Sequence, residues 1–87
     1  MTKIKTYVIN LGEYEKIKEI LPKMENKILN APKSYRYKGI EFHHIGETDV
    51  SLLYDGENII TIGGNQGSIS QTKSRLEQLS MIKLREV

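Results

Sequence analysis

The spacing of apolar residues along the chain switches between strand-like and helix-like periods and predicts most of the elements. Residues 3–11 place β-branched and aromatic side chains at neighbouring positions, so both faces of the segment are apolar. This is typical of an interior strand or one covered by a helix, and Gly12 is expected to break it. Apolar residues then recur three and four positions apart, which predicts a helix with one stripe: Tyr14, Ile17, Leu21, Met24 and Ile28.

Pro22 lies inside this predicted helix. It has no amide proton to donate to the carbonyl of Lys18, so a kink or a restart is expected there. The apolar stripe keeps its phase across Pro22, which favours the kink. Residues 30–32, Asn-Ala-Pro, are expected to end the helix.

Residues 34–45 alternate between apolar and polar side chains twice, with Gly39 between the two halves. This pattern indicates either one strand with a bulge at Gly39 or a tight hairpin that turns at Lys38-Gly39. We favour the bulged strand. Asp55-Gly56 then stands between two β-rich runs and predicts a hairpin, because both turn residues tolerate positive φ.

The glycine-rich residues 63–67 are expected to form a loop. Ser68 and Gln71 have the spacing of a capping box, which places the start of a second helix at Ser68. Residues 81–87 alternate weakly and are predicted to form a last strand. The apolar side of the second helix is expected to hold Ile69, Thr72, Leu76 and Leu79.

The predicted order of elements is β-α-β-β-β-α-β in a single domain, residues 1–87. A mostly antiparallel sheet with two helices on one face is a small two-layer α+β sandwich. The hairpin of residues 50–62 carries apolar residues on both faces. Two helices would leave part of this surface uncovered, so we expect a homodimer or a protein partner to take the rest.

Composition narrows the chemistry. The chain has 87 residues, of which 38% are hydrophobic and 28% charged, and it has no Cys. Disulfides, thiolate metal sites and a cysteine nucleophile are therefore excluded. Small secreted domains usually need disulfides, and residues 1–5 lack the apolar core of a signal peptide, so we expect a cytoplasmic protein without a membrane span.

Charge is segregated along the chain. Residues 1–38 carry nine Lys and Arg against four Glu, whereas residues 39–67 carry five acidic residues and no Lys or Arg. These charges either neutralise one another between elements of the fold or form a dipolar surface that steers a charged partner.

His43 and His44 are the first candidates for chemistry. Neighbouring residues on a strand point to opposite faces, so the two rings cannot share a metal, and no third ligand stands at a supporting spacing. Asp55 and Glu57 are expected to be solvated turn residues. No hydrolase, zinc-protease or Walker-type motif is present. We therefore expect no catalytic residues, no metal and no cofactor.

Two segments could bind a charged ligand. Residues 63–68 connect a strand to a capped helix and could cradle an anion, or could simply reverse the chain. Residues 33–38, Lys-Ser-Tyr-Arg-Tyr-Lys, interleave basic and aromatic side chains as a nucleic-acid-binding strand would.

Residues 49–76 resemble the C-terminal hairpin of CHAP-type cysteine amidases and endopeptidases. The likeness rests on an Asp-Gly turn followed by a strand that ends in Ile62-Gly63-Gly64-Asn65-Gln66. The catalytic His of that family would fall at Asp49, unless a register shift lets His44 serve, and its nucleophilic Cys has no counterpart. The resemblance therefore implies a shared hairpin or an inactive relic of a peptidoglycan hydrolase.

These observations favour a non-enzymatic protein-binding or regulatory module, of the kind that small phage and mobile-element reading frames often encode. It would act by dimerising or by occluding a protein partner. The alternatives are a nucleic-acid-binding module and the inactive hydrolase relic. The candidate partner-binding residues are Tyr35, Arg36, Tyr37, Lys38, Leu53, Tyr54, Asn65 and Gln66.

Overall fold

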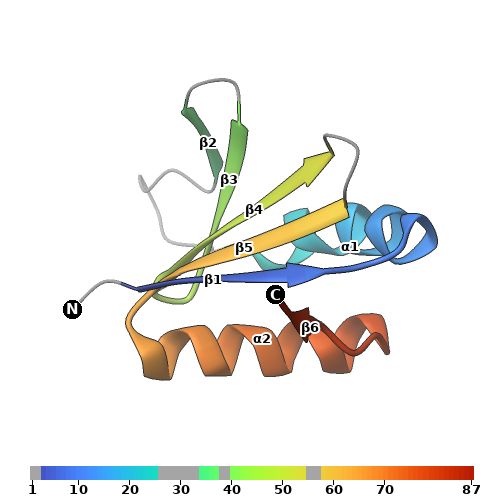
Figure 1. The fold of residues 1–87 in the computed structure, drawn as a ribbon. Helices are drawn as coiled ribbons and strands as arrows, with labels where there is room; N and C mark the ends of the chain where they lie inside the picture. Colours follow the sequence, from blue (N-terminus) through green and yellow to red (C-terminus); the bar gives the residue numbers. More distant parts are fainter. Residues whose placement is uncertain (1–2, 26–33, 38–39, 55–57) are drawn as a thin grey trace.

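The computed structural model describes residues 3–25, 34–37, 40–54 and 58–87. Within these ranges the chain forms two helices and six strands (Figure 1). In chain order they are β1 (Lys3–Val8), α1 (Leu11–Met24), β2 (Ser34–Tyr37), β3 (Ile40–Ile45), β4 (Thr48–Tyr54), β5 (Asn58–Gly64), α2 (Gln66–Ser80) and β6 (Arg85–Glu86).

The strands form one sheet in the order β2-β3-β4-β5-β1-β6, and every pair of neighbours is antiparallel. In Figure 1, α1 passes behind the sheet and α2 runs along its lower side. The buried side chains of both helices belong to one core cluster with those of the sheet. The predicted α+β two-layer fold is confirmed, and so is the interior position of β1, which lies between β5 and β6.

The favoured bulge at Gly39 is wrong. Residues 34–37 and 40–45 are two strands, and Tyr37 pairs with Ile40, which leaves two residues between them. This is the hairpin alternative. A hairpin lets residues 34–37 satisfy their backbone groups on β3, whereas a single bulged strand would have no partner for half of its length. The predicted hairpin of β4 and β5 is confirmed, with Tyr54 paired to Asn58, while residues 55–57 lie outside the described ranges.

Helix α1 begins earlier than Gly12 suggests. Asn10 is the N-cap: its side chain accepts from the Glu13 amide at 2.8 Å, and the Glu13 carboxylate accepts from the Asn10 amide at 2.9 Å. This reciprocal box satisfies the first turn, so Gly12 lies within the helix instead of breaking the chain. The helix continues through Pro22 and ends at Met24, and the predicted positions 28 and 30–32 lie outside the described residues.

Helix α2 also begins earlier than predicted. Asn65, not Ser68, is the N-cap, and its side chain accepts from the Ser68 amide at 2.8 Å. The expected loop is therefore reduced to a single residue between β5 and α2. Leu79, which was predicted in the apolar stripe, is exposed. It lies at the margin of that stripe near the end of the helix, and the buried residues are Ile69, Thr72, Leu76 and Ser80.

The predicted last strand is shorter than residues 81–87. Only Arg85 and Glu86 pair with β1, and the Val87 amide donates to the Thr6 carbonyl at 3.0 Å. Ile82 and Leu84 are nevertheless buried, as their alternation predicts. Among the described residues, no helix has the length and apolar character needed to cross a membrane.

Candidate protein-binding face

The two faces of the sheet have different surroundings. Alternate residues of a strand point to opposite faces, and directly paired residues share a face. One face packs against α1 and α2. No described helix covers the other, which we call the open face. The positions on it whose side chains are described are Ile4, Thr6, Val8, Ile40, Phe42, His44, Asp49, Ser51, Leu53, Ile59, Thr61, Gly63 and Arg85.

The strand register arranges the centre of the open face in three rows that cross β4, β5 and β1. An apolar row contains Leu53, Ile59 and Val8. A hydroxyl row lies next to it, and a third row contains an acidic residue, a glycine and an isoleucine. The hydroxyl row is Ser51, Thr61 and Thr6, and the third row is Asp49, Gly63 and Ile4.

Charge is scarce on this face. Of these thirteen positions, Asp49 is the only carboxylate and Arg85, on the edge strand β6, is the only Lys or Arg, although 28% of the chain is charged. Its apolar side chains are partly accessible, with exposed fractions of 69% for Ile4, 38% for Val8 and 36% for Leu53. Depletion of charge around accessible apolar groups is the composition found at the centre of protein interfaces.

A hollow of about 340 Å³ opens on this face where Gly63 has no side chain. Its lining combines apolar and acidic groups: Ile4, Phe42, Glu47, Asp49, Thr61, Gly63 and Gly64. The next residue, Gly64, has φ +154° and leaves no room for a side chain, since a Cβ there would lie 3.0 Å from the Glu47 carbonyl oxygen. The backbone of β5 is thereby held close to the β3–β4 turn.

The two histidines lie on opposite faces, as predicted. His43 is buried on the helix side, where its Nδ1 contacts the carboxylate of Glu25 at the end of α1. His44 lies on the open face, and its Nδ1 is 2.5 Å from Oδ1 of its cross-strand partner Asp49. Among the described residues, no three His, Asp or Glu side chains gather closely enough to hold a metal ion.

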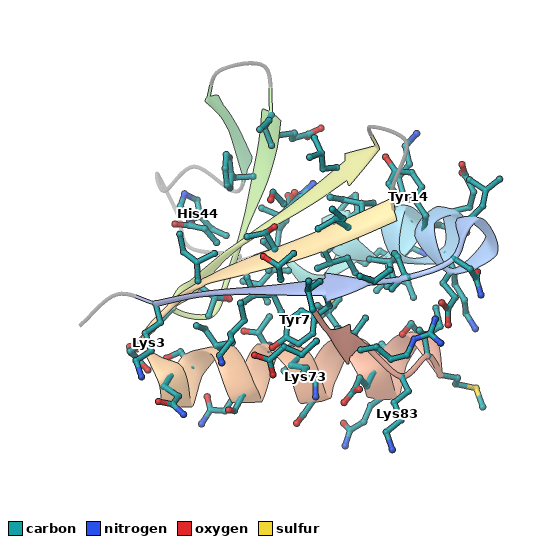
Figure 2. The ribbon with its side chains drawn as sticks, in the orientation of Figure 1. Lys3, Tyr7, Tyr14, His44, Lys73 and Lys83 are labelled. Atoms are coloured by element: carbon teal, nitrogen blue, oxygen red, sulfur yellow. The ribbon has the colours of Figure 1, made fainter. Side chains whose placement is uncertain are left out.

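The other side of β1 is held by charge and ring contacts. Tyr7 and Lys73 lie between β1 and α2 (Figure 2), with the Lys73 amine 5.6 Å from the ring centre. The Lys5 amine bonds the Glu86 carboxylate at 2.7 Å, which raises the pKa of Lys5 and lowers that of Glu86. These groups tie the terminal strand and α2 to β1, on the face opposite the open one.

The predicted anion cradle at residues 63–68 is occupied by the protein's own groups. The Asn65 side chain accepts a hydrogen bond from the Ser68 amide, and the Glu47 carboxylate accepts one from the Ser68 hydroxyl at 3.2 Å. The Glu47 carboxylate therefore already lies at the N-terminus of α2, where the helix dipole would otherwise favour an external anion. Gln66 accepts from the Lys3 amine at 2.9 Å.

The predicted partner-binding residues do not gather at one place. Leu53 lies in the apolar row of the open face, whereas Asn65 and Gln66 follow the other end of β5. The backbone of Tyr35, Arg36 and Tyr37 forms β2 at the sheet edge, and Tyr54 is the last residue of β4. The side chains of these four and the whole of Lys38 lie outside what is described. The other residues of the rows were not predicted, because only the register shows that Leu53 and Val8 flank Ile59.

Comparison of the chain with protein-family models, characterised proteins and solved structures finds no match. The geometry of the open face therefore stands as the basis for a functional proposal.

Proposed function

We propose that this chain is a non-enzymatic binding module that recognises a protein through the open face of its sheet. One observation carries the proposal: β4, β5 and β1 are packed by helices on one side and present an accessible apolar row on the other, on a face with one described carboxylate and one Arg. The module would be regulatory if its binding covers the surface through which the partner acts on other molecules.

The expected stabilisation of a complex comes from apolar side chains that are exposed to water. Leu53 and Val8 lie on either side of Ile59 in one row, and each side chain is accessible to solvent to a similar extent. Removing apolar surface from water contributes roughly 25 cal/mol per Å², so a partner that covers this row gains several side chains' worth of stabilisation. The hydroxyl row beside it consists of small side chains, of which Thr6 and Thr61 are half-buried and Ser51 is buried.

The absence of Cys supports a binding role over the hydrolytic activity that the CHAP-like hairpin would otherwise suggest. That chemistry needs a thiolate beside an imidazole. In this chain the imidazole of His44 instead contacts Asp49.

A matched pair of substitutions tests the proposal. Leu53→Glu places a charge in the apolar row, and Leu79→Glu places the same charge at an exposed leucine on α2. Tagged wild type and both variants are used to capture proteins from a native lysate of the source organism, with circular dichroism as a check of folding and light scattering as a check for self-association.

We expect wild type and Leu79→Glu to capture the same discrete protein, or to form the same dimer, and Leu53→Glu to lose at least about tenfold of the yield, as charge burial at an interface centre requires. Equal capture by Leu53→Glu and wild type would remove the open face as the binding surface.

A further inference from the structure

We propose that the hollow above Gly63 receives a basic side chain, Arg or Lys, that the protein partner presents to the open face. This inference rests on the proposed function and deepens it, because it names the chemistry of the partner's central contact.

The hollow follows from the pairing of β5 with its two neighbouring strands. In the row Asp49, Gly63, Ile4 the central residue has no side chain, so the two flanking side chains border a gap of about 340 Å³. That volume falls at the lower end of the range of ligand pockets, enough for one long side chain. Its floor is the backbone of Gly63 and Gly64.

The walls suit the two parts of a basic side chain. Ile4 and Phe42 supply apolar surface for the alkyl stem, and an aromatic ring also attracts a cation. Asp49 and Glu47 are also among the lining residues, and the Asp49 side chain, which His44 contacts, is 42% exposed, so its carboxylate can accept a further charge-assisted hydrogen bond from a guanidinium or ammonium group. Thr61 adds a hydroxyl oxygen as a further acceptor.

Charge complementarity favours a cation over every other occupant. Two of the residues that line the hollow are acidic and none is Lys or Arg. The two basic residues that flank Ile4 direct their amines elsewhere, Lys3 to Gln66 and Lys5 to Glu86. An acidic side chain would meet repulsion from Asp49, and a purely apolar one would strip water from the Asp49 carboxylate without replacing it.

The first experiment is an NMR titration of the ¹⁵N-labelled chain with N-acetyl-arginine methylamide, and in parallel with the neutral isostere N-acetyl-citrulline methylamide. We expect the arginine probe to shift the amide signals around Gly63, Asp49 and Thr61, with at least roughly fivefold lower Kd than citrulline, in line with a partly exposed charge pair. Equal shifts from the two probes, or shifts confined to another part of the molecule, would overturn the inference.

Substitutions at two positions test whether the arginine probe binds in the hollow. Gly63→Val fills the hollow, and Gly63→Ala is the milder form, since a Cβ at this position lies no closer than 3.8 Å to any neighbour and the fold accepts it. Asp49→Asn removes one carboxylate charge, with Glu19→Gln on α1 as the matched control. Arginine binding should weaken in Gly63→Ala, Gly63→Val and Asp49→Asn and be unchanged in Glu19→Gln.

The two proposals fail separately. If Leu53→Glu abolishes partner capture while the Gly63 and Asp49 variants bind the arginine probe as wild type does, the face binds a protein but the hollow does not take a cation. If the probe binds in the hollow while Leu53→Glu captures partner normally, the hollow is a cation pocket outside any protein interface, and the inference falls with the proposed function.

Discussion

The two faces of the sheet use neighbouring residues of the same strands for different purposes. On β5, Ile60 and Ile62 are fully buried under the helices, while Ile59 and Thr61 alternate with them on the open face and are only half-buried. The first set holds the layers together. The second set lies on the face that no described helix covers. A strand that is apolar on both faces therefore has one surface used in folding and a second that no described helix covers, which we propose is used for association.

The largest expected effect comes from replacing two adjacent residues by alanine, one on each face of the sheet. Ile60→Ala opens a cavity in the core and should lower the free energy of unfolding by about 2–5 kcal/mol. Ile59→Ala, on the open face, should cost only about 1 kcal/mol. Urea unfolding followed by circular dichroism measures both, and similar losses in the two variants would contradict the division into a structural and a free face.

The two pairs of a histidine and a carboxylate also differ in burial between the two faces. Side chains of His43 and Glu25 are 11% and 12% exposed, whereas those of His44 and Asp49 are 30% and 42% exposed. Glu25→Ala strips a buried imidazole of its partner and should cost about 2 kcal/mol. Asp49→Ala should cost less than about 1 kcal/mol, as accessible pairs do. Chemical denaturation at neutral pH compares the variants; an equal or greater loss in Asp49→Ala would show that the open-face pair is structural.

The two adjacent glycines of β5 should respond differently to alanine. Gly64→Ala places a Cβ 3.0 Å from a carbonyl oxygen at φ +154°, a backbone region that L-residues avoid, so a loss of about 1–3 kcal/mol is expected. Gly63→Ala meets nothing closer than 3.8 Å and should be neutral or gain up to about 1 kcal/mol, because the unfolded chain loses freedom. Thermal unfolding ranks the two variants; a stabilised Gly64→Ala would refute the close approach to the β3–β4 turn.

The smallest effect belongs to the helix-covered face and appears at alkaline pH. Burial raises the pKa of Tyr7, and the Glu86 carboxylate adds to the shift. The unfolded chain therefore loses its tyrosine proton first. The associated stability is complete below the ordinary tyrosine pKa of about 10 and is lost as pH rises from there through the folded pKa.

The matched variant is Tyr7→Phe, which keeps the ring and removes the titrating group. The fall in the urea midpoint between pH 8 and pH 11 should be smaller in Tyr7→Phe than in wild type. Part of the fall remains in the variant, because the pKa of Lys5 is also raised by Glu86 and its contribution is lost in the same direction. An identical fall in both proteins would show that Tyr7 does not contribute.

The fold was largely readable from the sequence, since local periods determined β1, α1, the β4–β5 hairpin and α2. The errors fell where side chains compete for the same backbone groups. Asn65 and Ser68 are both good helix caps, and only the structure shows that Asn65 takes the amide. Gly39 fits a bulge as well as a turn, and the choice depends on whether residues 34–37 find a partner strand, which is not a local property.

The open face was harder to predict than the fold. Its apolar row joins Val8 to Leu53 and Ile59, which are distant in the sequence, and its hollow depends on Gly63 lying between Asp49 and Ile4. Sequence reasoning found Leu53 because hairpin alternation is local. It could not find Val8 or Ile4, because the pairing of β1 with β5 sets their neighbours.

Site-specific photocrosslinking tests the binding role of the open face most directly. A benzoylphenylalanine is placed at position 53 in one protein and at position 79 in another, and both are irradiated in the native lysate. The open face predicts one discrete crosslinked product from position 53 and none from position 79. Crosslinks of equal yield and identity from both positions, or none from position 53, would contradict it.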